Sequence, residues 1–480
     1  MKNTPQCIQS SAQNLVCGEW VDSPQTFTVL NKFTNQALAT VSAATREQVR
    51  QAVGMLQEAA VQGPPPPAER ASVLRSAAAL LRERRAAFLD VLVAEAGFTL
   101  VDAESEVDRA AITLNLCAEE ATRLVGEVVP FAASPGAHNR IGFTQRFPIG
   151  VVCAITPFNS PLNTVLHKVG PAFAAGNAVA LKPSSLTPLT ATLLGHLLLD
   201  AGMPSNFLAI LHGDGNTLGQ WLLEEEAIGF YTFTGSTRVG RAIQQRAGLR
   251  RTQMELGSIA STIVCASADQ AKAADRVANA AFRKAGQVCT SVQRLYVHAS
   301  IVEEFLPRLI EAAGKLKAGD PTDPRTRVGP LISEKAAMQA EEWIADAVSK
   351  GAKLLCGGQR TGSVVAPAIL TDVPPAAKLW TQEAFAPVLA LQPFETLEAA
   401  IAGANASPYG LSAGIFSSNI HECMHAAKHL RFGTVQINES SSARSDVMPF
   451  GGVKDSGFGK EGPWHAMREM TEERLLIFNP

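Results

Sequence analysis

The spacing of apolar residues along the chain changes near residue 148. Before that point, apolar residues recur at helical spacing among many charged ones over 68–96 and again over 103–125. A Gly-Pro-Pro-Pro-Pro run at 63–67 precedes the first of these segments and suits a helix start, because proline is tolerated in a first turn. The pattern therefore predicts that the opening third is largely helical.

After residue 148, short apolar runs typical of β-strands alternate with amphipathic segments. The predicted strands are 150–155, 178–181, 207–211, 228–233 and 253–256, and the predicted helices between them are 161–175, 187–202, 216–226 and 237–247. Alternation of this length implies parallel strands joined by right-handed crossovers. We therefore expect a doubly wound α/β sheet, which binds ligands at the carboxyl ends of its strands.

A second α/β series begins near residue 257. It comprises predicted strands at 262–266 and 295–298 and predicted helices near 269–285 and 301–317. The interval 126–148 alternates like a β-hairpin inserted between the early helices and the first sheet strand. Such an arm has few partners of its own, so we expect it to pair with another subunit.

Length, net charge and cysteine content limit the number of domains, the kinds of partner and the cellular location. A chain of 480 residues exceeds what one core serves comfortably, so two or three domains are expected. The net charge of −2 argues against nucleic acid or an anionic membrane as a partner. The N-terminus lacks the apolar core of a secretory signal, and no apolar run reaches the ~18 residues of a membrane span. Eight scattered cysteines without a CxxC pair favour a reducing, cytoplasmic location.

One cysteine of the eight does not fit a packing role. Most free cysteines are small buried hydrophobes, and Cys153 and Cys265 lie in apolar runs of that kind. Cys289, in Ala-Gly-Gln-Val-Cys-Thr (285–290), instead lies on a loop after a helix-ending glycine. A thiol in that place can stay partly exposed and react as a thiolate. On local context alone, a packing role and a functional role fit Cys289 equally well.

Polar side chains follow several predicted strands at the sheet edge where ligands bind. Asn159 offers amide donors of the kind an oxyanion hole needs, and Lys182 offers a cation to a ribose or phosphate oxygen. Ser236 begins a helix, and Glu255 could serve as a general base if burial raises its pKa. Each residue also has a plainer interpretation as a helix cap or a solvated charge. The turn at 213–219 reads GxGxxxG, one residue longer than a dinucleotide fingerprint, and a plain β–α turn is at least as good an interpretation.

A possible metal motif occurs near the C-terminus. His421-Glu422-x-x-His425 matches the H-E-x-x-H site of zinc metalloproteases. The surrounding segment, 419–429, has the polar pattern of a solvated surface helix, and no downstream ligand is evident. We therefore expect no metal site, and a zinc-dependent hydrolase is the minor alternative.

Taken together and in this order, the segments resemble the NAD(P)-dependent aldehyde dehydrogenase superfamily over residues 15–475. The pieces that carry the resemblance are Thr-Pro-Phe-Asn (156–159), Leu-Lys-Pro (181–183), Phe-Thr-Gly-Ser (233–236), Glu-Leu-Gly (255–257), Gly-Gln-Val-Cys (286–289), Gly-Pro-Leu (329–331), Glu-Ala-Phe (383–385), Tyr-Gly-Leu (409–411) and Pro-Phe-Gly-Gly (449–452). The resemblance is closest to non-acylating members that oxidise lactaldehyde or semialdehydes.

The resemblance implies the family's α/β fold and its division into a cofactor domain, a catalytic domain and an oligomerisation arm. A cofactor domain would comprise residues 1–125 and 146–257, with a doubly wound parallel sheet that binds NAD or NADP. A catalytic α/β domain, 258–462, would carry the nucleophilic cysteine. Residues 126–145 and 463–480 would form an oligomerisation arm, so a homodimer or homotetramer is expected.

The resemblance also implies catalytic roles. Cys289 would attack the aldehyde carbon to give a thiohemiacetal, and the Asn159 side chain with the Cys289 backbone N–H would stabilise the developing oxyanion. Loss of hydride to the cofactor leaves a thioester, which water activated by Glu255 would hydrolyse. The presence of Glu255 favours formation of a carboxylic acid over transfer to coenzyme A.

The expected cofactor contacts follow from the same motifs. Lys182 and Glu383 match the residues that hold the two riboses, and Ser236 matches the pyrophosphate contact. The full expected set is Thr156, Pro157, Phe158, Lys182, Ser184, Ser185, Gly215, Gly235, Ser236, Leu256, Gly257, Glu383 and Phe385. Two residues depart from the common pattern. Ser185 stands where NAD-preferring members often have a glutamate that would repel a 2′-phosphate, so both NAD and NADP are permitted; Ser258 replaces the common second glycine.

The substrate is less defined by the sequence. Arg109 and Arg444 are candidates for holding a substrate anion, with an ordinary salt bridge as the alternative for each. Val288 and Thr290, which flank the nucleophile, are uncharged substrate-site candidates, and they argue against a densely cationic pocket. The expected substrate is a small hydroxy- or carboxy-substituted aldehyde such as lactaldehyde or succinate semialdehyde. A non-catalytic nucleotide-binding relative is a further alternative, against which the retained catalytic side chains speak.

Overall fold

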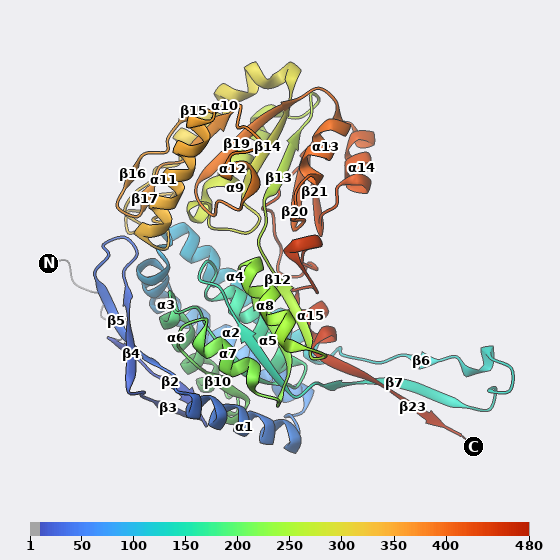
Figure 1. Cartoon of the computed structure of the whole chain (residues 1–480). Coiled ribbons are helices and arrows are strands. Elements are labelled where there is room, and N and C mark those ends of the chain that lie inside the picture. The colour runs from blue at the N-terminus through green and yellow to red at the C-terminus, as the bar shows by residue number, and fades with distance from the viewer. Residues whose placement is uncertain (1–9, 480) are drawn as a thin grey trace.

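Two large sheets, one in each lobe of the molecule, organise the chain (Figure 1). The computed structural model describes residues 10–479. Within that range no helix has the length and apolar character needed to cross a membrane.

The first sheet has eight strands in the order β22-β12-β11-β8-β9-β10-β2-β3. Its central strands are parallel and match the predicted ones: β8 (Val151–Ile155), β9 (Ala178–Lys182), β10 (Leu208–Ile210), β11 (Ile228–Thr234) and β12 (Arg251–Glu255). The crossover helices are α5 (Asn163–Ala174), α6 (Pro188–Asp200), α7 (Thr217–Glu224) and α8 (Thr237–Ala247). Antiparallel strands β2 (Asn14–Val16), β3 (Glu19–Val21) and β22 (Gly457–Phe458) complete the edges. The expected doubly wound α/β sheet is confirmed.

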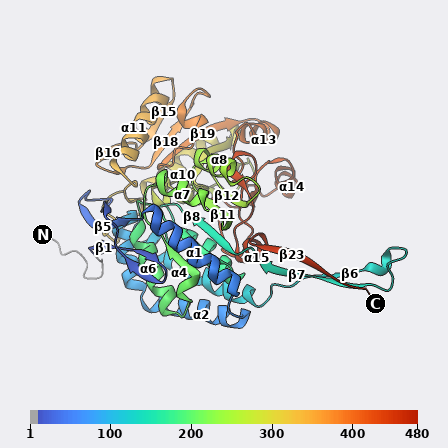
Figure 2. The same ribbon diagram turned by 60° about the horizontal axis from the view of Figure 1, so that its bottom comes forward.

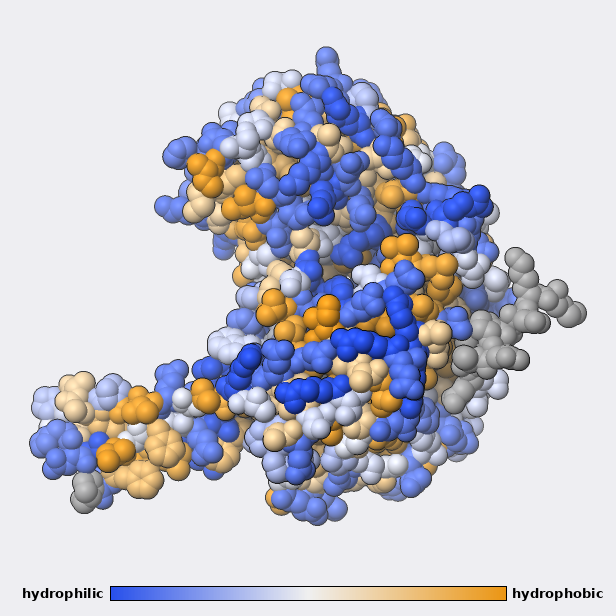
Figure 3. All heavy atoms as spheres, turned by 180° about the vertical axis from the view of Figure 1, so that it is seen from behind, coloured by the Kyte–Doolittle hydropathy of each residue, from blue (hydrophilic) through white to orange (hydrophobic). Residues whose placement is uncertain are grey.

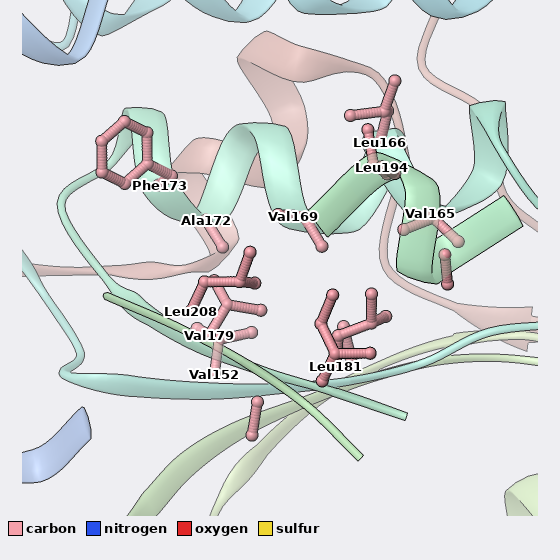
Figure 4. Close-up of a cluster of buried hydrophobic side chains, with 14 of the residues drawn as sticks. Val152, Val165, Leu166, Val169, Ala172, Phe173, Val179, Leu181, Leu194 and Leu208 are labelled. Atoms are coloured by element: carbon pink, nitrogen blue, oxygen red, sulfur yellow. The ribbon is translucent and has the colours of Figure 1, made fainter. Parts of the chain in front are cut away.

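The centre of this sheet is buried on both faces. Every residue of β8 and β9 is buried, which explains why these strands read as continuous apolar runs. Figure 4 shows α5 packing onto them, with Val169 and Ala172 pointing toward Val179 and Val152. Burying one such side chain fully contributes about 1.5–3 kcal/mol, so this layer holds the carboxyl ends of the strands rigidly.

The early part of the chain is helical only from residue 46 onward. There it forms α1 (Arg46–Gln62), α2 (Pro67–Glu83), α3 (Arg85–Val91), a π-helix (Leu92–Ala96) and α4 (Leu100–Ala121). Residues 11–43 instead form β1 (Ser11–Ala12), β2, β3, β4 (Gln25–Leu30) and β5 (Ala37–Ala43). β1, β3 and β4 carry many exposed residues, so their apolar pattern is weak, and β2 joins the first sheet by pairing with the distant β10.

The second sheet has seven strands in the order β15-β18-β19-β14-β13-β20-β21, all parallel except β15. The strands are β13 (Ala260–Val264), β14 (Val292–His298), β15 (Lys353–Cys356), β18 (Ala368–Thr371), β19 (Val388–Phe394), β20 (Ser412–Phe416) and β21 (Thr434–Ile437). Its helices are α9 (Gln270–Phe282), α10 (Val302–Gly314), α11 (Glu334–Ser349), α12 (Lys378–Thr381), α13 (Leu397–Asn405) and α14 (Ile420–His429). A small hairpin of β16 (Arg360–Thr361) and β17 (Val364–Val365) lies beside α11.

A three-stranded antiparallel arm projects from the body (Figures 1 and 2). It consists of β6 (Val128–Val129), β7 (Ile141–Pro148) and the C-terminal β23 (Thr471–Phe478). Residues 463–470, which we grouped with the arm, differ from that expectation. They include α15 (Pro463–Glu469), whose side chains Ala466 and Met467 join the core of the first sheet.

Candidate active site

One cavity of about 610 Å³ lies where the carboxyl ends of the first sheet face the second lobe. The segments after β8, β9, β11 and β12 line it from one side, and the segment around Cys289 lines it from the other. Each residue expected at a catalytic, cofactor or substrate site lines this cavity. The structure therefore brings together residues that lie as far apart in the sequence as Arg109 and Arg444.

Cys289 lies on a loop held by a tight left-handed turn at the end of α9. Lys284, Ala285 and Gly286 all have positive φ, at 50°, 53° and 70°. Glycine is required at 286, since a Cβ there would lie 2.1 Å from the backbone oxygen of Ala386. Burial and the neighbouring Glu255 raise the pKa of the Cys289 thiol to about 12. The thiol is therefore protonated in this state and must lose its proton before it can attack.

Asn159 faces the nucleophile loop from the turn after β8. Its side-chain Nδ2 donates a hydrogen bond of 2.8 Å to the backbone oxygen of Gln287, two residues before Cys289. A primary amide carries two N–H donors, so one remains for an oxygen atom in the cavity. This arrangement suits an oxyanion donor.

Glu255 ends β12 and is only 2% exposed. Its Oε1 atom has no hydrogen-bond partner within residues 10–479, and it lies against Gly451, where a Cβ would come within 2.9 Å of that oxygen. Burial and the nearby Glu461 carboxylate raise the pKa of Glu255 well above its usual value. A carboxylate with a raised pKa is a stronger base, as proton abstraction from water requires.

A buried charged cluster that the sequence did not reveal lies behind Glu255. The Glu461 carboxylate accepts hydrogen bonds from Lys168 Nζ at 3.0 Å and Arg444 Nη2 at 2.7 Å. Although burial opposes it, these two cations hold the pKa of Glu461 well below its usual value. The available sequence signal was a lysine at 168 in the mainly apolar second half of the helix predicted over 161–175.

Three arginines line the substrate end of the cavity, although the uncharged Val288 and Thr290 had argued against a densely cationic pocket. Arg109 donates two hydrogen bonds to Asp446, at 2.7 and 3.0 Å, and Arg444 donates one to Glu461. Arg283 donates to Ser442, and no carboxylate lies within 4.0 Å of its guanidinium in the described part of the chain. Val288 and Thr290 are uncharged, but the left-handed turn brings Arg283, six residues before the nucleophile, to the same pocket.

The opposite end of the cavity fits a dinucleotide. A groove between α7 and α8 has a floor of small and apolar residues (Gly219, Leu223, Val239, Ala242 and Ile243), and Gln220, Arg238 and Arg246 also line it. Lys182 is 4% exposed, and the one hydrogen bond that its ammonium makes within residues 10–479 goes to the backbone oxygen of Pro183, at 3.4 Å. Burial lowers the pKa of Lys182 to about 8, and a buried ammonium with so few acceptors suits a ribose hydroxyl or a phosphate.

Three further segments at this end are held by hydrogen bonds within the chain. Ser236 caps α8 by accepting the N–H of Val239, at the positive end of the helix. At the N-terminus of α7 the Asp214 carboxylate accepts the backbone N–H groups of Asn216 and Thr217. The 213–219 segment is therefore an ordinary β–α turn whose N–H groups are bonded within the turn, and it contributes Gly215 to the cavity wall. Ser258 donates its backbone N–H to Glu383, and its φ is not positive, which explains why serine is tolerated there.

The H-E-x-x-H match lies on α14, outside the cavity lining. The Glu422 carboxylate accepts hydrogen bonds from the hydroxyls of Ser267 and Ser417. It is therefore held by the protein and is not placed to activate water on a metal bound by His421 and His425. The zinc-hydrolase alternative finds no support in this geometry.

Comparison with known proteins agrees with the geometry of the site. The model of the aldehyde dehydrogenase family matches residues 20–476. A 3-sulfolactaldehyde dehydrogenase of Priestia aryabhattai is 46% identical over 464 residues, which cover 97% of each chain. The chain belongs to the aldehyde dehydrogenase family. It is an oxidoreductase that converts an aldehyde with NAD or NADP as cofactor.

Two solved structures show the same fold. Aldehyde dehydrogenase 21 from Physcomitrella patens, in complex with the reaction product succinate, aligns with a TM-score of 0.94 at 35% identity and 98% coverage of both chains. The NADP-dependent glyceraldehyde-3-phosphate dehydrogenase from Bacillus halodurans C-125, complexed with NADP, aligns with a TM-score of 0.95 at 33% identity. That alignment covers 98% of this chain and 100% of the other.

Proposed function

We propose that this enzyme oxidises a small aldehyde bearing an anionic group to the corresponding carboxylic acid. The observation that carries the proposal is Arg283, a cavity-lining guanidinium without a carboxylate partner in the described part of the chain. Arg109 and Arg444 line the same cavity as cations paired with Asp446 and Glu461. The relatives named above act on sulfonated or phosphorylated aldehydes or bind succinate, which supports an anionic substrate.

The reaction follows from three side chains. The Cys289 sulfur, once deprotonated, bonds to the aldehyde carbon, and the carbonyl oxygen becomes an oxyanion that the Asn159 amide and the Cys289 backbone N–H stabilise. A nicotinamide cofactor held in the groove would supply the hydride acceptor, and loss of hydride from that carbon would leave a thioester on Cys289. Glu255 then takes a proton from water as the water oxygen attacks the thioester carbon. The thiolate leaves, the acid is released, and the enzyme is restored.

We place the cofactor in the eight-stranded lobe, with Lys182 and Glu383 holding its riboses and Ser236 next to its pyrophosphate. Thr156, Pro157, Phe158, Ser184, Gly235, Leu256, Gly257 and Phe385 would complete the groove. Ser185 leaves room for a 2′-phosphate, so we expect both NAD and NADP to bind. In this scheme the seven-stranded lobe is the catalytic domain that supplies Cys289.

The experiment that tests the proposed function is a panel of small aldehydes assayed with NAD and with NADP. The panel pairs neutral aldehydes with analogues of equal size that carry a carboxylate, sulfonate or phosphate. We expect kcat/KM for the anionic members to exceed that of their neutral partners by about 10- to 100-fold, the effect of one or two charge-assisted hydrogen bonds. Equal kcat/KM values across the pairs would contradict an anion site.

Arg283→Gln tests the residue that carries this proposal. One hydrogen bond to a charged group is worth about 1.5–3 kcal/mol, so KM for the anionic aldehyde should rise roughly 10- to 100-fold. KM for the neutral analogue should stay within about threefold. The matched control is Arg246→Gln, which removes a cavity-lining arginine in the last turn of α8, at the nucleotide end of the cavity, and should not separate the two aldehydes. A similar rise in KM for both aldehydes would show that Arg283 acts on packing alone.

We also propose that the arm mediates assembly into a dimer or tetramer. It carries exposed apolar side chains among polar ones (Figure 3), with Val128 81% exposed and Phe478 57% exposed. Isolated exposed strands with apolar faces gain by covering each other in a second subunit. Val128→Glu combined with Phe478→Glu should shift the sedimentation coefficient toward that of the monomer. Val61→Glu, at an equally exposed position of α1, should leave assembly unchanged. If the sedimentation coefficient of the arm variant equals that of the parent enzyme, the arm does not mediate assembly.

A further inference from the structure

Lys284 is a buried ammonium close to the nucleophile that the mechanism above does not use. The residue is only 9% exposed and has a left-handed backbone, a conformation that lysine adopts rarely. Its Nζ atom donates a hydrogen bond of 2.8 Å to Glu106 and one of 3.1 Å to the backbone oxygen of Asn159. The ammonium also lies 4.2 Å from the centre of the Phe98 ring. A buried ammonium that makes these contacts from a left-handed residue restrains the positions of the groups that it binds.

Glu106, the partner of Lys284, ties three separate segments together. It projects from α4 and accepts hydrogen bonds from the Ser160 hydroxyl at 2.7 Å and the Asn163 backbone N–H at 2.9 Å. Both donors belong to the turn and helix that follow β8, which carry Asn159. The ion pair therefore joins α4, the Asn159 turn and the loop that leads to Cys289.

The contacts around Asn159 form a closed ring. Lys284 holds the backbone oxygen of Asn159, and the side chain of Asn159 holds the backbone oxygen of Gln287 in the same loop as Lys284. Because Cys289 follows Gln287 by two residues, this ring sets the place of the Asn159 amide relative to the sulfur. We propose that Lys284 is a positioning residue that fixes the oxyanion donor Asn159 against Cys289. This inference rests on the proposed function, in which Asn159 stabilises the oxyanion.

The test uses the full-length enzyme with the double substitution Lys284→Met and Glu106→Gln. The double variant avoids a buried unpaired carboxylate, and the amide oxygen introduced by Glu106→Gln remains an acceptor for the bonds from Ser160 and Asn163. Small misplacements of a catalytic group cost up to about 100-fold in rate, so we expect kcat to fall about 10- to 100-fold. KM for the aldehyde and Kd for NAD and NADP should stay within about threefold.

A second readout separates positioning of the amide from general loosening of the loop. Alkylation of Cys289 by iodoacetamide requires the thiolate but develops no oxyanion on a carbonyl carbon. Its rate should therefore stay within about threefold in the double variant. A fall in alkylation equal to the fall in kcat would overturn the inference, because Lys284 would then hold the nucleophile and not the amide.

Asn159→Ala distinguishes failure of this inference from failure of the proposed function. With Asn159→Ala in place, Lys284→Met with Glu106→Gln should lower kcat no further. If Asn159→Ala lowers kcat and the double variant does not, the inference fails and the function stands. If Asn159→Ala has no effect, the oxyanion role fails and the inference falls with it. Should Lys284→Met not fold, Lys284→Asn in the Glu106→Gln background suits the left-handed backbone and carries the same expectations.

Discussion

Cys289→Ala is expected to abolish aldehyde oxidation, lowering kcat by about 10⁴-fold or more, the scale seen when a covalent nucleophile is removed. The methyl group of alanine cannot form the bond to the aldehyde carbon, so neither the thiohemiacetal nor the thioester can arise. The formation of reduced cofactor, followed by absorbance, measures the loss. Binding of NAD and NADP, measured by calorimetry, should be unchanged because Cys289 lies away from the α7–α8 groove.

The control for this substitution is Cys17→Ala, which removes an exposed thiol on the first lobe. That variant should keep full activity, and it should also keep the sensitivity of activity to iodoacetamide. Turnover by Cys289→Ala within about tenfold of the parent enzyme would contradict the assignment of the nucleophile.

Glu255→Gln is expected to separate the two halves of the reaction. Glutamine has the size of glutamate but cannot take a proton from water, so hydrolysis of the thioester should slow by about 10²- to 10⁴-fold. Stopped-flow measurement should show a burst of reduced cofactor close to one equivalent per active site, followed by slow turnover. A steady-state rate equal to that of the parent enzyme would show that another group activates the water.

The raised pKa of Glu255 gives this prediction a pH dependence. Below its pKa the carboxyl is protonated and cannot act as a base, so the parent deacylation rate should rise as pH increases through that pKa. The slow deacylation of Glu255→Gln should lack this rise. A rise of equal size in Glu255→Gln would assign the titration to a different group.

Much of the fold could be predicted from the apolar pattern. β8 and β9 are buried on both faces and their segments read as uninterrupted apolar runs, which the surrounding helical patterns separate clearly. The strands between residues 11 and 43 were missed because β3 and β4 lack a run of buried apolar residues, and because β2 joins the sheet by pairing with β10, far along the chain. The local spacing of apolar residues does not indicate which distant strands pair.

The sequence by itself determined the nucleophile Cys289, the base Glu255 and the amide Asn159 as candidates, because each stands in a short motif whose position relative to a strand is local information. The tertiary structure alone decided what surrounds them. Arg109 and Arg444 could be substrate anchors or salt-bridge partners until the fold placed Asp446 and Glu461 against them.

The charge of the pocket and the support of the oxyanion donor were likewise decided only by the fold. Arg283 and Lys284 are adjacent in the chain, yet one faces the cavity without a carboxylate partner in the described residues while the other pairs with Glu106, 178 residues away. The left-handed turn and the packing of α4 produce that difference. Which ion pairs form depends on distances across the folded molecule, and no spacing along the chain encodes those distances.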